Sequence, residues 1–461
     1  MNYKRDKGKP VSLIKHVTII VIFNFIFQVQ SAEFKQGKQI TELPKILSHR
    51  DRVKPANDIV KHRLDHLLPR LMQETELDMW LVINREYEED PLFYSLVPHT
   101  TFAARRTTIL VFVRSKSGDV KRFTVSRYPI AGFYESKWKG GSQQQQWQRL
   151  AEIIKEYDPK KIGINTSINW PLSDGLTHGL YQQLFNVIDP KYQQRLTSAE
   201  PLVIRWMETR IQPELEIYPH IVEIARAVIA EAFSSKVIMP GVTTTDDVAW
   251  YIRERFESLQ LRPWFQPYVN IQRKGDDVTK EAPFYGKSGI VIIAGDVLHT
   301  DVGICYLKLC TDTQEMGYVL RLGESDVPQG LKRALAKGNQ WQDSLTDSFK
   351  AGLTGNQILA NAKKQSRKAN LEASIYTHPI GFVGHAIGPT IGMWDNQGDT
   401  PVRGDWPLNP NTAYAIEGNI KIPVAEWDNQ WVQIKLEQTA VFDGNHVIYL
   451  GGRQTRWHLV E

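Results

Sequence analysis

Cysteine is scarce in this sequence. The 461 residues include only two cysteines, Cys305 and Cys310, which lie five positions apart. A chain of this length with so little cysteine does not rely on a framework of disulfide bonds. Successive side chains of a strand alternate between its faces, so this odd separation would direct the two thiols to opposite faces of one continuous strand. A disulfide between them therefore requires a turn in the intervening chain.

The chain also has little net charge beyond its first residues. Its formal net charge is +5, of which the first 32 residues account for +4, from Lys4, Arg5, Lys7, Lys9 and Lys15 against Asp6. Only +1 (5 minus 4) is left for the remaining residues. Nucleic-acid binding requires a concentrated field of Lys and Arg side chains. We therefore expect no nucleic-acid partner.

Long hydrophobic runs are missing except for one near the N-terminus. Residues 17–27 read VTIIVIFNFIF, and they follow a basic segment and precede QVQSA. This order is typical of a secretory signal peptide. As a helix the run would rise about 16 Å, less than the roughly 30 Å of a hydrocarbon core, which disfavours an uncleaved membrane anchor. We predict a signal peptide at 1–32 that is cleaved near Ser31 or Ala32. The expected product is periplasmic or secreted, without stable membrane insertion.

The composition is otherwise that of an ordinary globular protein, with 42% hydrophobic, 23% charged and 10% aromatic residues. Disorder, collagen and coiled coil are thereby excluded as the main architecture, and the length allows two or three domains. Residues 33–205 contain four apolar runs that predict strands, at 79–83, 107–113, 121–125 and 161–165. Helical spacing occurs at 59–71 and 142–157. Strands alternating with helices predict an α/β domain.

Residues 206–461 have a different pattern. Helical spacing runs over 214–237 and again to about 259, where Thr245 and Asp246 offer oxygens to cap the second helix. Apolar strand patterns then predominate, at 290–293, 297–306, 311–320, 413–422 and 431–442. Helices followed by a large antiparallel sheet predict an α+β domain.

Carboxylates occur at several places inside these strand patterns. Asp301 stands in VLHTDVG and Asp312 eleven residues later in CTDTQ, so a turn near Lys308 can bring both onto one face of a hairpin. Each aspartate alone is equally typical of a turn cap. Glu417 and Glu437 lie in YAIEGN and IKLEQT, where burial is costly unless the charge is paired or bound to a metal.

One histidine joins this set. His385 lies in GHAIGP, where the glycines allow close approach of another group, although a lone histidine is more often a packed residue. Asp301, Asp312, His385, Glu417 and Glu437 together could surround two divalent cations, because four carboxylates balance their charge. Oxygen-rich ligation with one imidazole suits Mn²⁺, Co²⁺ or Zn²⁺.

The order Asp, Asp, His, Glu, Glu in the contexts TDVG, TDTQ, GHAIG, IEG and LEQ resembles the M24 metallopeptidases, which include Xaa-Pro aminopeptidases, prolidases and methionine aminopeptidases. The resemblance covers roughly residue 208 to the C-terminus, and the preceding smaller domain is similar to that of aminopeptidase P and creatinase. It implies a pita-bread catalytic domain of two related halves around a dinuclear centre. It further implies that Asp301 binds one metal, that Asp312 and Glu437 bridge, and that His385 and Glu417 complete the other shell.

The chain departs from this pattern at two places. The family usually has a histidine shortly before the first ligand strand, where this chain has Ala282-Pro-Phe-Tyr-Gly, and a second one seven residues after the ligand histidine, where it has Gly392. His299 shares a strand face with Asp301, and His378 lies in YTHPIG. Either could replace a missing catalytic histidine, and either could equally be a packed residue.

The favoured hypothesis is an exported metallo-aminopeptidase that hydrolyses the N-terminal bond of a peptide substrate, with Xaa-Pro bonds as the expected target. Two alternatives stay open. A binding protein on a catalytically silent M24 fold is favoured by the missing histidines, whereas the complete ligand set argues against it. A creatinase-like hydrolase of a small C–N compound would not require metal ligands. A homodimer is an open expectation for the assembly.

Overall fold

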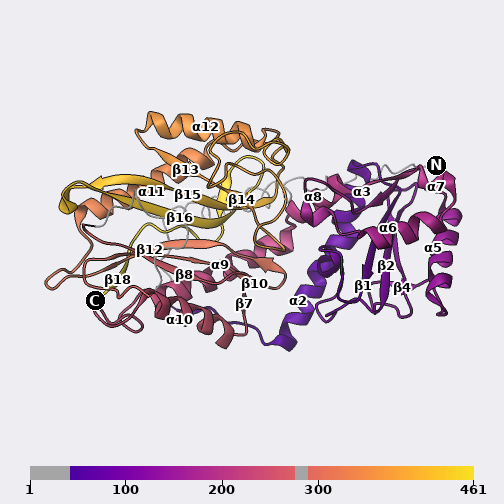
Figure 1. The fold of residues 1–461 in the computed structure, drawn as a ribbon, viewed down its shortest axis with the longest axis horizontal. Helices are drawn as coiled ribbons and strands as arrows, with labels where there is room; N and C mark the ends of the chain where they lie inside the picture. The colour runs from indigo at the N-terminus through magenta and orange to yellow at the C-terminus, as the bar shows by residue number, and fades with distance from the viewer. Residues whose placement is uncertain (1–41, 276–288) are drawn as a thin grey trace, which may run out of the picture.

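The computed structural model describes residues 42–275 and 289–461, which form two lobes (Figure 1). The predicted signal peptide, 1–32, lies outside these residues. Helix α2 (His49–His62) and helix α8 (Glu200–Glu208) lie where the lobes meet. Within the described ranges, no helix has both the length and the apolar character needed to cross a membrane.

The N-terminal lobe is a six-stranded mixed sheet with helices on it, as the alternation of patterns predicted. The strand order is β4-β3-β2-β1-β5-β6. The strands are β1 (Met79–Arg85), β2 (Thr107–Arg114), β3 (Val120–Val125), β4 (Glu135–Ser136), β5 (Ile162–Ile164) and β6 (Leu196–Ser198). The further helices are α3 (Leu68–Glu74), α4 (Phe93–Leu96), α5 (Gln143–Tyr157), α6 (His178–Val187) and α7 (Pro190–Gln193). The predicted domain boundary at 205/206 falls inside α8 and stays a prediction.

The C-terminal lobe is built on a large, mainly antiparallel sheet. Its main path has the order β13-β15-β16-β12-β9-β8, and β14, β17 and β18 pair with β15, β16 and β12. The strands are β8 (Tyr268–Gln272), β9 (Val297–Val302), β12 (Thr313–Val319), β13 (Ala373–Ile375), β14 (His378–Pro379), β15 (Thr412–Val424), β16 (Gln430–Phe442), β17 (Val447–Tyr449) and β18 (His458–Val460). A smaller sheet contains β7 (Arg262–Pro263), β10 (Ile304–Tyr306) and β11 (Leu309–Cys310).

Two helix pairs cover this sheet, and they repeat one local design. The pairs are α9 (Gln212–Ala232) with α10 (Thr245–Ser258), and α11 (Gln329–Thr346) with α12 (Gly355–Lys368). A glycine with positive φ, Gly241 or Gly352, lies between the helices of each pair. A capping box on Thr244 or Thr354 then begins each second helix. In Figure 1 the pairs lie toward opposite edges of the sheet.

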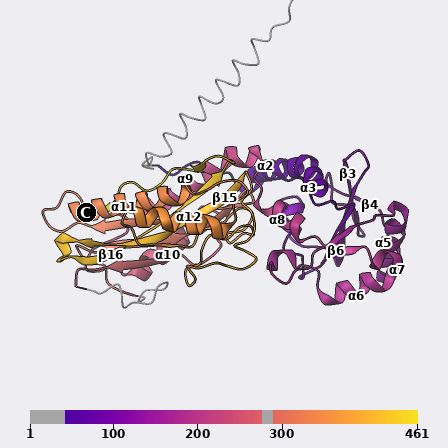
Figure 2. The same cartoon turned by 90° about the horizontal axis from the view of Figure 1, so that it is seen from above.

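The strand order has the same symmetry. Read from the junction between β16 and β12, the sequence β16-β15-β13 on one side matches β12-β9-β8 on the other. The structure therefore has the two related halves that the resemblance implied. Figure 2 shows the long hairpin of β15 and β16 extending beside α11 and α12.

Four local predictions differ from the structure. The helices α11 and α12 were not expected, and residues 290–293 form only an isolated bridge from Val291 to Thr244. The cap of α10 is Thr244 with Asp247, not Thr245 with Asp246, because these are the residues whose side chains reach the free backbone groups. The strand expected over 297–306 breaks at Gly303, where any Cβ would overlap the Trp264 ring.

The chain turns between the two cysteines, and they form a disulfide. Leu307 and Lys308 adopt positive φ in the turn from β10 to β11. This turn makes Cys305 and Cys310 a directly opposed pair in the register, and the structure joins them. The condition that the sequence imposed on a disulfide is therefore met.

Polar contacts fix the N-terminal lobe to the C-terminal lobe. Arg63 is buried beside α2, and its Nη1 lies 2.9 Å from Oε2 of Glu214 on α9. The ammonium of Lys308, in the turn of the disulfide hairpin, donates to the carbonyl of Val97 at 3.1 Å. The hairpin that precedes Asp312 therefore contacts both lobes.

A buried charge cluster holds β12 against α9 and β18. Oε1 of Glu315 accepts from Nε of Arg226 at 2.6 Å, and its Oε2 lies 2.5 Å from Nε2 of His458. Burial alone would raise the pKa of this carboxyl, but Arg226 and His458 outweigh it and lower the pKa to about 2. The ionised form of Glu315 is thus part of the folded state.

We expect Glu315→Gln to lower the free energy of unfolding at pH 7 by about 3–5 kcal/mol, because it leaves the Arg226 charge buried without its partner. The folded-state pKa is below the usual value of the carboxyl, so this contribution is present above about pH 4.5 and is lost as the pH falls toward 2. Urea unfolding at pH 7, 4.5 and 3 measures it, with the exposed Glu257→Gln as control. A difference between variant and wild type that does not shrink in acid would contradict this assignment.

Candidate metal centre

Four side chains form a row across the C-terminal sheet, one from each of four adjacent strands. In register they are Asp301 on β9, Gln314 on β12, Glu437 on β16 and Glu417 on β15. Directly opposed residues of neighbouring strands point to the same face. The predicted ligands Asp301, Glu417 and Glu437 are therefore brought together, and all three are buried.

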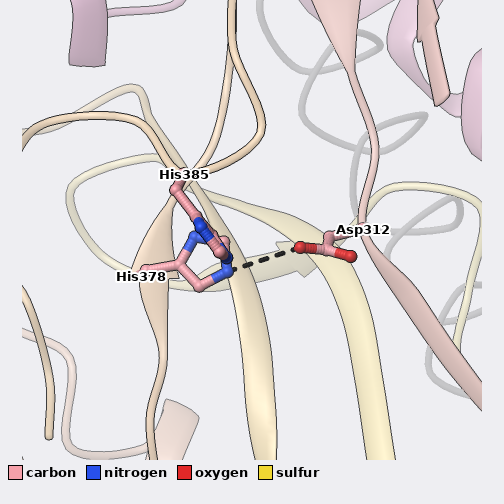
Figure 3. Close-up of side chains that lie close together, drawn as sticks. All are labelled: Asp312, His378 and His385. Carbon is pink, nitrogen blue, oxygen red and sulfur yellow. Dashed lines mark ion pairs between the residues drawn. The ribbon is translucent and has the colours of Figure 1, made fainter. Parts of the chain in front are cut away.

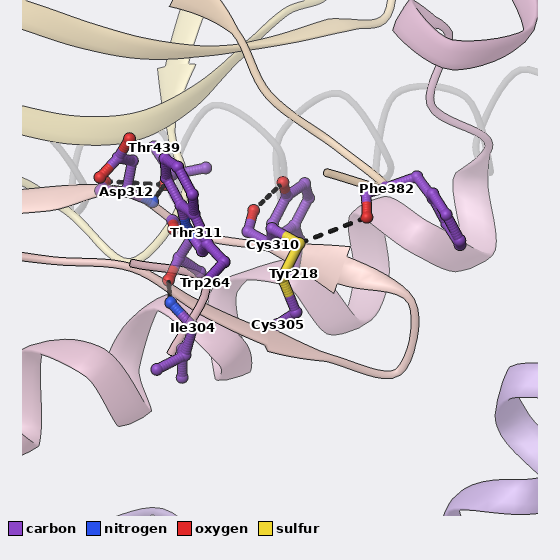
Figure 4. The surroundings of a disulfide bond; sticks show 9 residues. All are labelled: Tyr218, Trp264, Ile304, Cys305, Cys310, Thr311, Asp312, Phe382 and Thr439. Carbon is purple, nitrogen blue, oxygen red and sulfur yellow. Dashed lines mark hydrogen bonds between the residues drawn. A yellow bond between two sulfur atoms is a disulfide. The ribbon is translucent and has the colours of Figure 1, made fainter. Parts of the chain in front are cut away.

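Asp312 joins this row from the segment between β11 and β12, where hydrogen bonds fix the backbone of residues 310–312 (Figure 4). The hydroxyl of Thr439 accepts from the Asp312 amide at 3.2 Å and donates to its carbonyl at 3.1 Å. The Trp264 indole donates to the Thr311 carbonyl at 2.9 Å, and the Tyr218 hydroxyl donates to the Cys310 carbonyl at 2.5 Å. These contacts place the Asp312 carboxylate beside Asp301 and Glu437.

His378, proposed from the sequence as a catalytic residue, lies beside three of the four carboxylates. Its Nε2 is 3.5 Å from Asp312 Oδ2, 3.7 Å from Glu437 Oε1 and 3.8 Å from Glu417 Oε2. Its Nδ1 lies 3.0 Å from the Pro379 carbonyl, which can only accept, so Nδ1 carries the hydrogen. The Nε2 lone pair of the neutral ring therefore faces three carboxylates. Burial lowers the pKa of His378 to about 3, which keeps the ring neutral at pH 7.

His385, proposed from the sequence as the ligand histidine, is more exposed and lies against His378 (Figure 3). The two rings meet edge to face with centroids 4.7 Å apart. The other neighbour of His385 is Trp264, at 4.9 Å, and this indole occupies the space that a Cβ on Gly384 would need. The close approach expected at the glycines thus exists, and the approaching group is an aromatic ring.

Electrostatics make this arrangement unfavourable without a cation. Burial raises the pKa of Asp301 to about 7. Burial and the neighbouring carboxylates raise the pKa of Asp312, Glu417 and Glu437 well above their usual values. The carboxylates therefore repel one another when ionised, and a positive charge placed among them would be strongly held.

The unpaired atoms show where a cation fits. Asp301 Oδ1, Asp312 Oδ1, Glu437 Oε1 and His378 Nε2 are all buried without a hydrogen-bond partner among the described residues. Leaving one such atom unpaired costs about 1–3 kcal/mol. Three overlapping groups have ligand atoms within 4.8 Å of one another: Asp301, Asp312 and Glu437; His378, Glu417 and Glu437; and Asp312, His378 and His385. The donor set thus fits two divalent metal ions that share Asp312 and Glu437.

His299, the other histidine proposed as catalytic, lies outside these groups. It is buried, and its Nε2 is 2.8 Å from Oε1 of Gln314. Gln314 in turn contacts Glu417 and Glu437, so His299 reaches the carboxylates only through an amide. The two-residue period placed His299 on the correct face, but nothing in the sequence pattern singled out Gln314, Trp264 or Tyr268, whose hydroxyl donates to Asp301 Oδ2 at 3.1 Å.

The departure at Gly392 has a structural reason. Gly392 has φ of 72°, and a Cβ there would lie 2.1 Å from the carbonyl oxygen of Ile375. The neighbouring Ile391 pairs with Thr377, next to His378. A side chain at position 392 is therefore incompatible with this backbone. The other departure, at Ala282, lies outside the described residues.

Comparisons with known proteins give one family and one fold. The sequence profile of metallopeptidase family M24 matches residues 216–443. Among curated proteins, none matches the chain significantly. An X-Pro aminopeptidase from Thermotoga maritima is similar in structure, with a TM-score of 0.61, 18% identity, and coverage of 85% of this chain and 100% of that one.

Two other solved structures are similar to the same extent. A Xaa-Pro dipeptidase from Bacillus anthracis has a TM-score of 0.60 and 18% identity, covering 88% of this chain and 99% of its own. A prolidase from Pyrococcus horikoshii has a TM-score of 0.56 and 15% identity, covering 86% and 99%. At these identities the likeness shows the fold, which includes both lobes.

We expect purified protein loaded with Mn²⁺, Co²⁺ or Zn²⁺ to hold about two ions per chain, and Asp312→Ala to lose both, because Asp312 belongs to the group on each side. Elemental analysis after dialysis measures the ratio, and the exposed Asp395→Ala serves as control. Normal metal content in Asp312→Ala would show that the site is misplaced, and a fall to one ion would reject the shared role.

The same assay separates the two histidines. His378→Ala should lower metal affinity more than His385→Ala does, because Nε2 of His378 faces three carboxylates whereas His385 is at the exposed side. If His385→Ala lowered metal affinity more than His378→Ala does, His385 would be the main imidazole ligand.

Proposed function

Because residues 216–443 belong to metallopeptidase family M24, we propose that this protein is a dinuclear-metal aminopeptidase that hydrolyses the N-terminal bond of peptides, with Xaa-Pro bonds as its target. The observation that carries the proposal is the convergence of four buried carboxylates and His378, because Asp301, Asp312, Glu437 and His378 each keep a buried atom without a hydrogen-bond partner among the described residues. The Xaa-Pro specificity is supported by the names of the similar structures, an X-Pro aminopeptidase and a Xaa-Pro dipeptidase.

Each residue of the site has a role in this reaction. Asp301 would bind one divalent ion, and His378 and Glu417 would bind the other, while Asp312 and Glu437 would be shared between them. When bound, the ions would polarise the scissile carbonyl and lower the pKa of a water molecule. The protein then needs no serine or cysteine nucleophile. His385 and Trp264 form an aromatic wall on the more exposed side, where they can contact the substrate.

The glycine at position 392 favours a second candidate function, a binding protein on a catalytically inactive M24 fold. The backbone admits no side chain there, so a transition-state donor at that position is missing. The loss of one such donor typically costs about 10²- to 10³-fold in rate. His385 is close enough to the centre to supply a hydrogen bond in its place, since its ring contacts that of His378. We therefore favour slow catalysis over none.

We expect metal-dependent release of the first residue from Xaa-Pro dipeptides or tripeptides, and its loss in Glu417→Gln, which keeps the size but removes the ligand charge. Product analysis by chromatography with Mn²⁺, Co²⁺ or Zn²⁺ tests it, and circular dichroism verifies that the variant is folded. If metal-loaded protein binds peptides but cleaves none, the silent fold is correct. Cleavage of a small amidine by metal-stripped protein would favour the creatinase-like hydrolase.

Export is the second part of the proposal, and it rests on the sequence of residues 1–32 alone. Expression of the full chain in its native host should yield a mature form that begins after Ser31 or Ala32, outside the cytoplasm. Mass spectrometry of the N-terminus in fractionated cells measures this. An intact Met1 end in the cytoplasmic fraction would contradict it.

A further inference from the structure

The row of side chains across the sheet contains one neutral member. Asp301, Gln314, Glu437 and Glu417 come from strands β9, β12, β16 and β15. The two halves of the sheet are related about the junction of β12 and β16, so Asp301 corresponds to Glu417, and Gln314 corresponds to Glu437. An amide thus occupies the place where the other half has a carboxylate.

This amide contacts one oxygen of each glutamate. Nε2 of Gln314 donates to Glu417 Oε1 at 2.5 Å and to Glu437 Oε2 at 2.9 Å. The remaining oxygens, Glu417 Oε2 and Glu437 Oε1, are those that lie 3.8 and 3.7 Å from His378 Nε2. In each glutamate, one oxygen therefore accepts from Gln314 and the other faces His378.

His299 fixes the orientation of the amide. Its Nε2 lies 2.8 Å from Oε1 of Gln314, and an amide oxygen can only accept, so His299 donates from Nε2. Nδ1 of His299 is buried with no hydrogen-bond partner among the described residues. If the amide were reversed, its oxygen would face two carboxylates and its NH₂ would meet the ring N–H. The histidine and the glutamates thus favour the same orientation.

We infer that His299 and Gln314 are a pair of positioning residues that present Glu417 and Glu437 to the metal site through one oxygen each. Because Oε2 of Glu437 accepts from the amide, Glu437 would present Oε1 to a bound ion. Asp312, which belongs to a group on each side, would be the residue best placed to be shared between two ions. This inference deepens the proposed function and rests on its metal centre. It changes the role of His299 from catalysis to orientation.

Gln314→Met keeps the shape of the side chain and removes both donated hydrogen bonds. Loss of a group that orients metal ligands typically costs 10- to 100-fold in metal affinity. We expect a loss of this size for Mn²⁺, measured by calorimetry on the full chain with folding verified by circular dichroism. The matched control is Gln454→Met, because that buried amide bonds the Met316 backbone on the same strand. Its Mn²⁺ affinity should stay within about threefold of wild type.

Two variants of His299 separate orientation from packing. Glutamine places an NH₂ group where Nε2 of the ring lies, whereas asparagine places it near Nδ1 and cannot reach Gln314. His299→Gln should therefore retain Mn²⁺ affinity and His299→Asn should lose it by the same 10- to 100-fold as Gln314→Met. Equal affinities of the two His299 variants, or a Gln314→Met value close to wild type, would overturn the positioning role alone. Wild-type protein that binds no Mn²⁺ would overturn the proposed function as well.

Discussion

The close packing of four carboxylates in the interior is the constraint on which the C-terminal lobe depends. Two like charges about 4 Å apart repel by about 4 kcal/mol even at an effective dielectric constant of 20. Asp301, Asp312, Glu417 and Glu437 are nevertheless held together by a register that runs unbroken between β15 and β16 and by the Thr439 hydroxyl on the Asp312 backbone. Because these contacts fix the strands, bound cations would relieve the repulsion without movement of the strands.

The internal symmetry explains how one chain assembles such a site. Each half contributes a helix pair, a positive-φ turn and three neighbouring strands. The outer strands also place a tyrosine beside a carboxylate in each half, since Tyr268 pairs with Asp301 and the Tyr376 amide donates to the Glu417 carbonyl. The row of ligands therefore crosses the axis that relates the halves. The halves have diverged at the two inner strands, where Gln314 faces Glu437, and this difference makes the two sides of the centre chemically unequal.

Residues with an unusual local context could be predicted from the sequence, and residues defined by distant contacts could not. Glu417 and Glu437 are conspicuous because a carboxylate interrupts an apolar strand pattern. Gln314 is not conspicuous in the sequence, because only its pairing with Asp301 and Glu437 on neighbouring strands brings it to the carboxylates. Helix α11 was missed because its buried face includes Gly338, Asn339 and Gln342, which hide the apolar periodicity. The order of the motifs predicted His385 as a ligand. That His378 lies closer to the carboxylates depends on the folded backbone and could not be predicted from the sequence.

The disulfide hairpin connects this centre to the N-terminal lobe. Lys308 in its turn bonds the carbonyl of Val97, and Cys310 at its end donates to the carbonyl of Gly381 at 2.7 Å. Gly381 lies between His378 and His385 and packs against the Arg210 guanidinium, which also bonds Glu214. Glu214 is the partner of Arg63 from the other lobe. Two separate routes of contacts thus run from the N-terminal lobe to Gly381, so the segment that carries both histidines of the candidate metal centre is held by contacts that begin in both lobes.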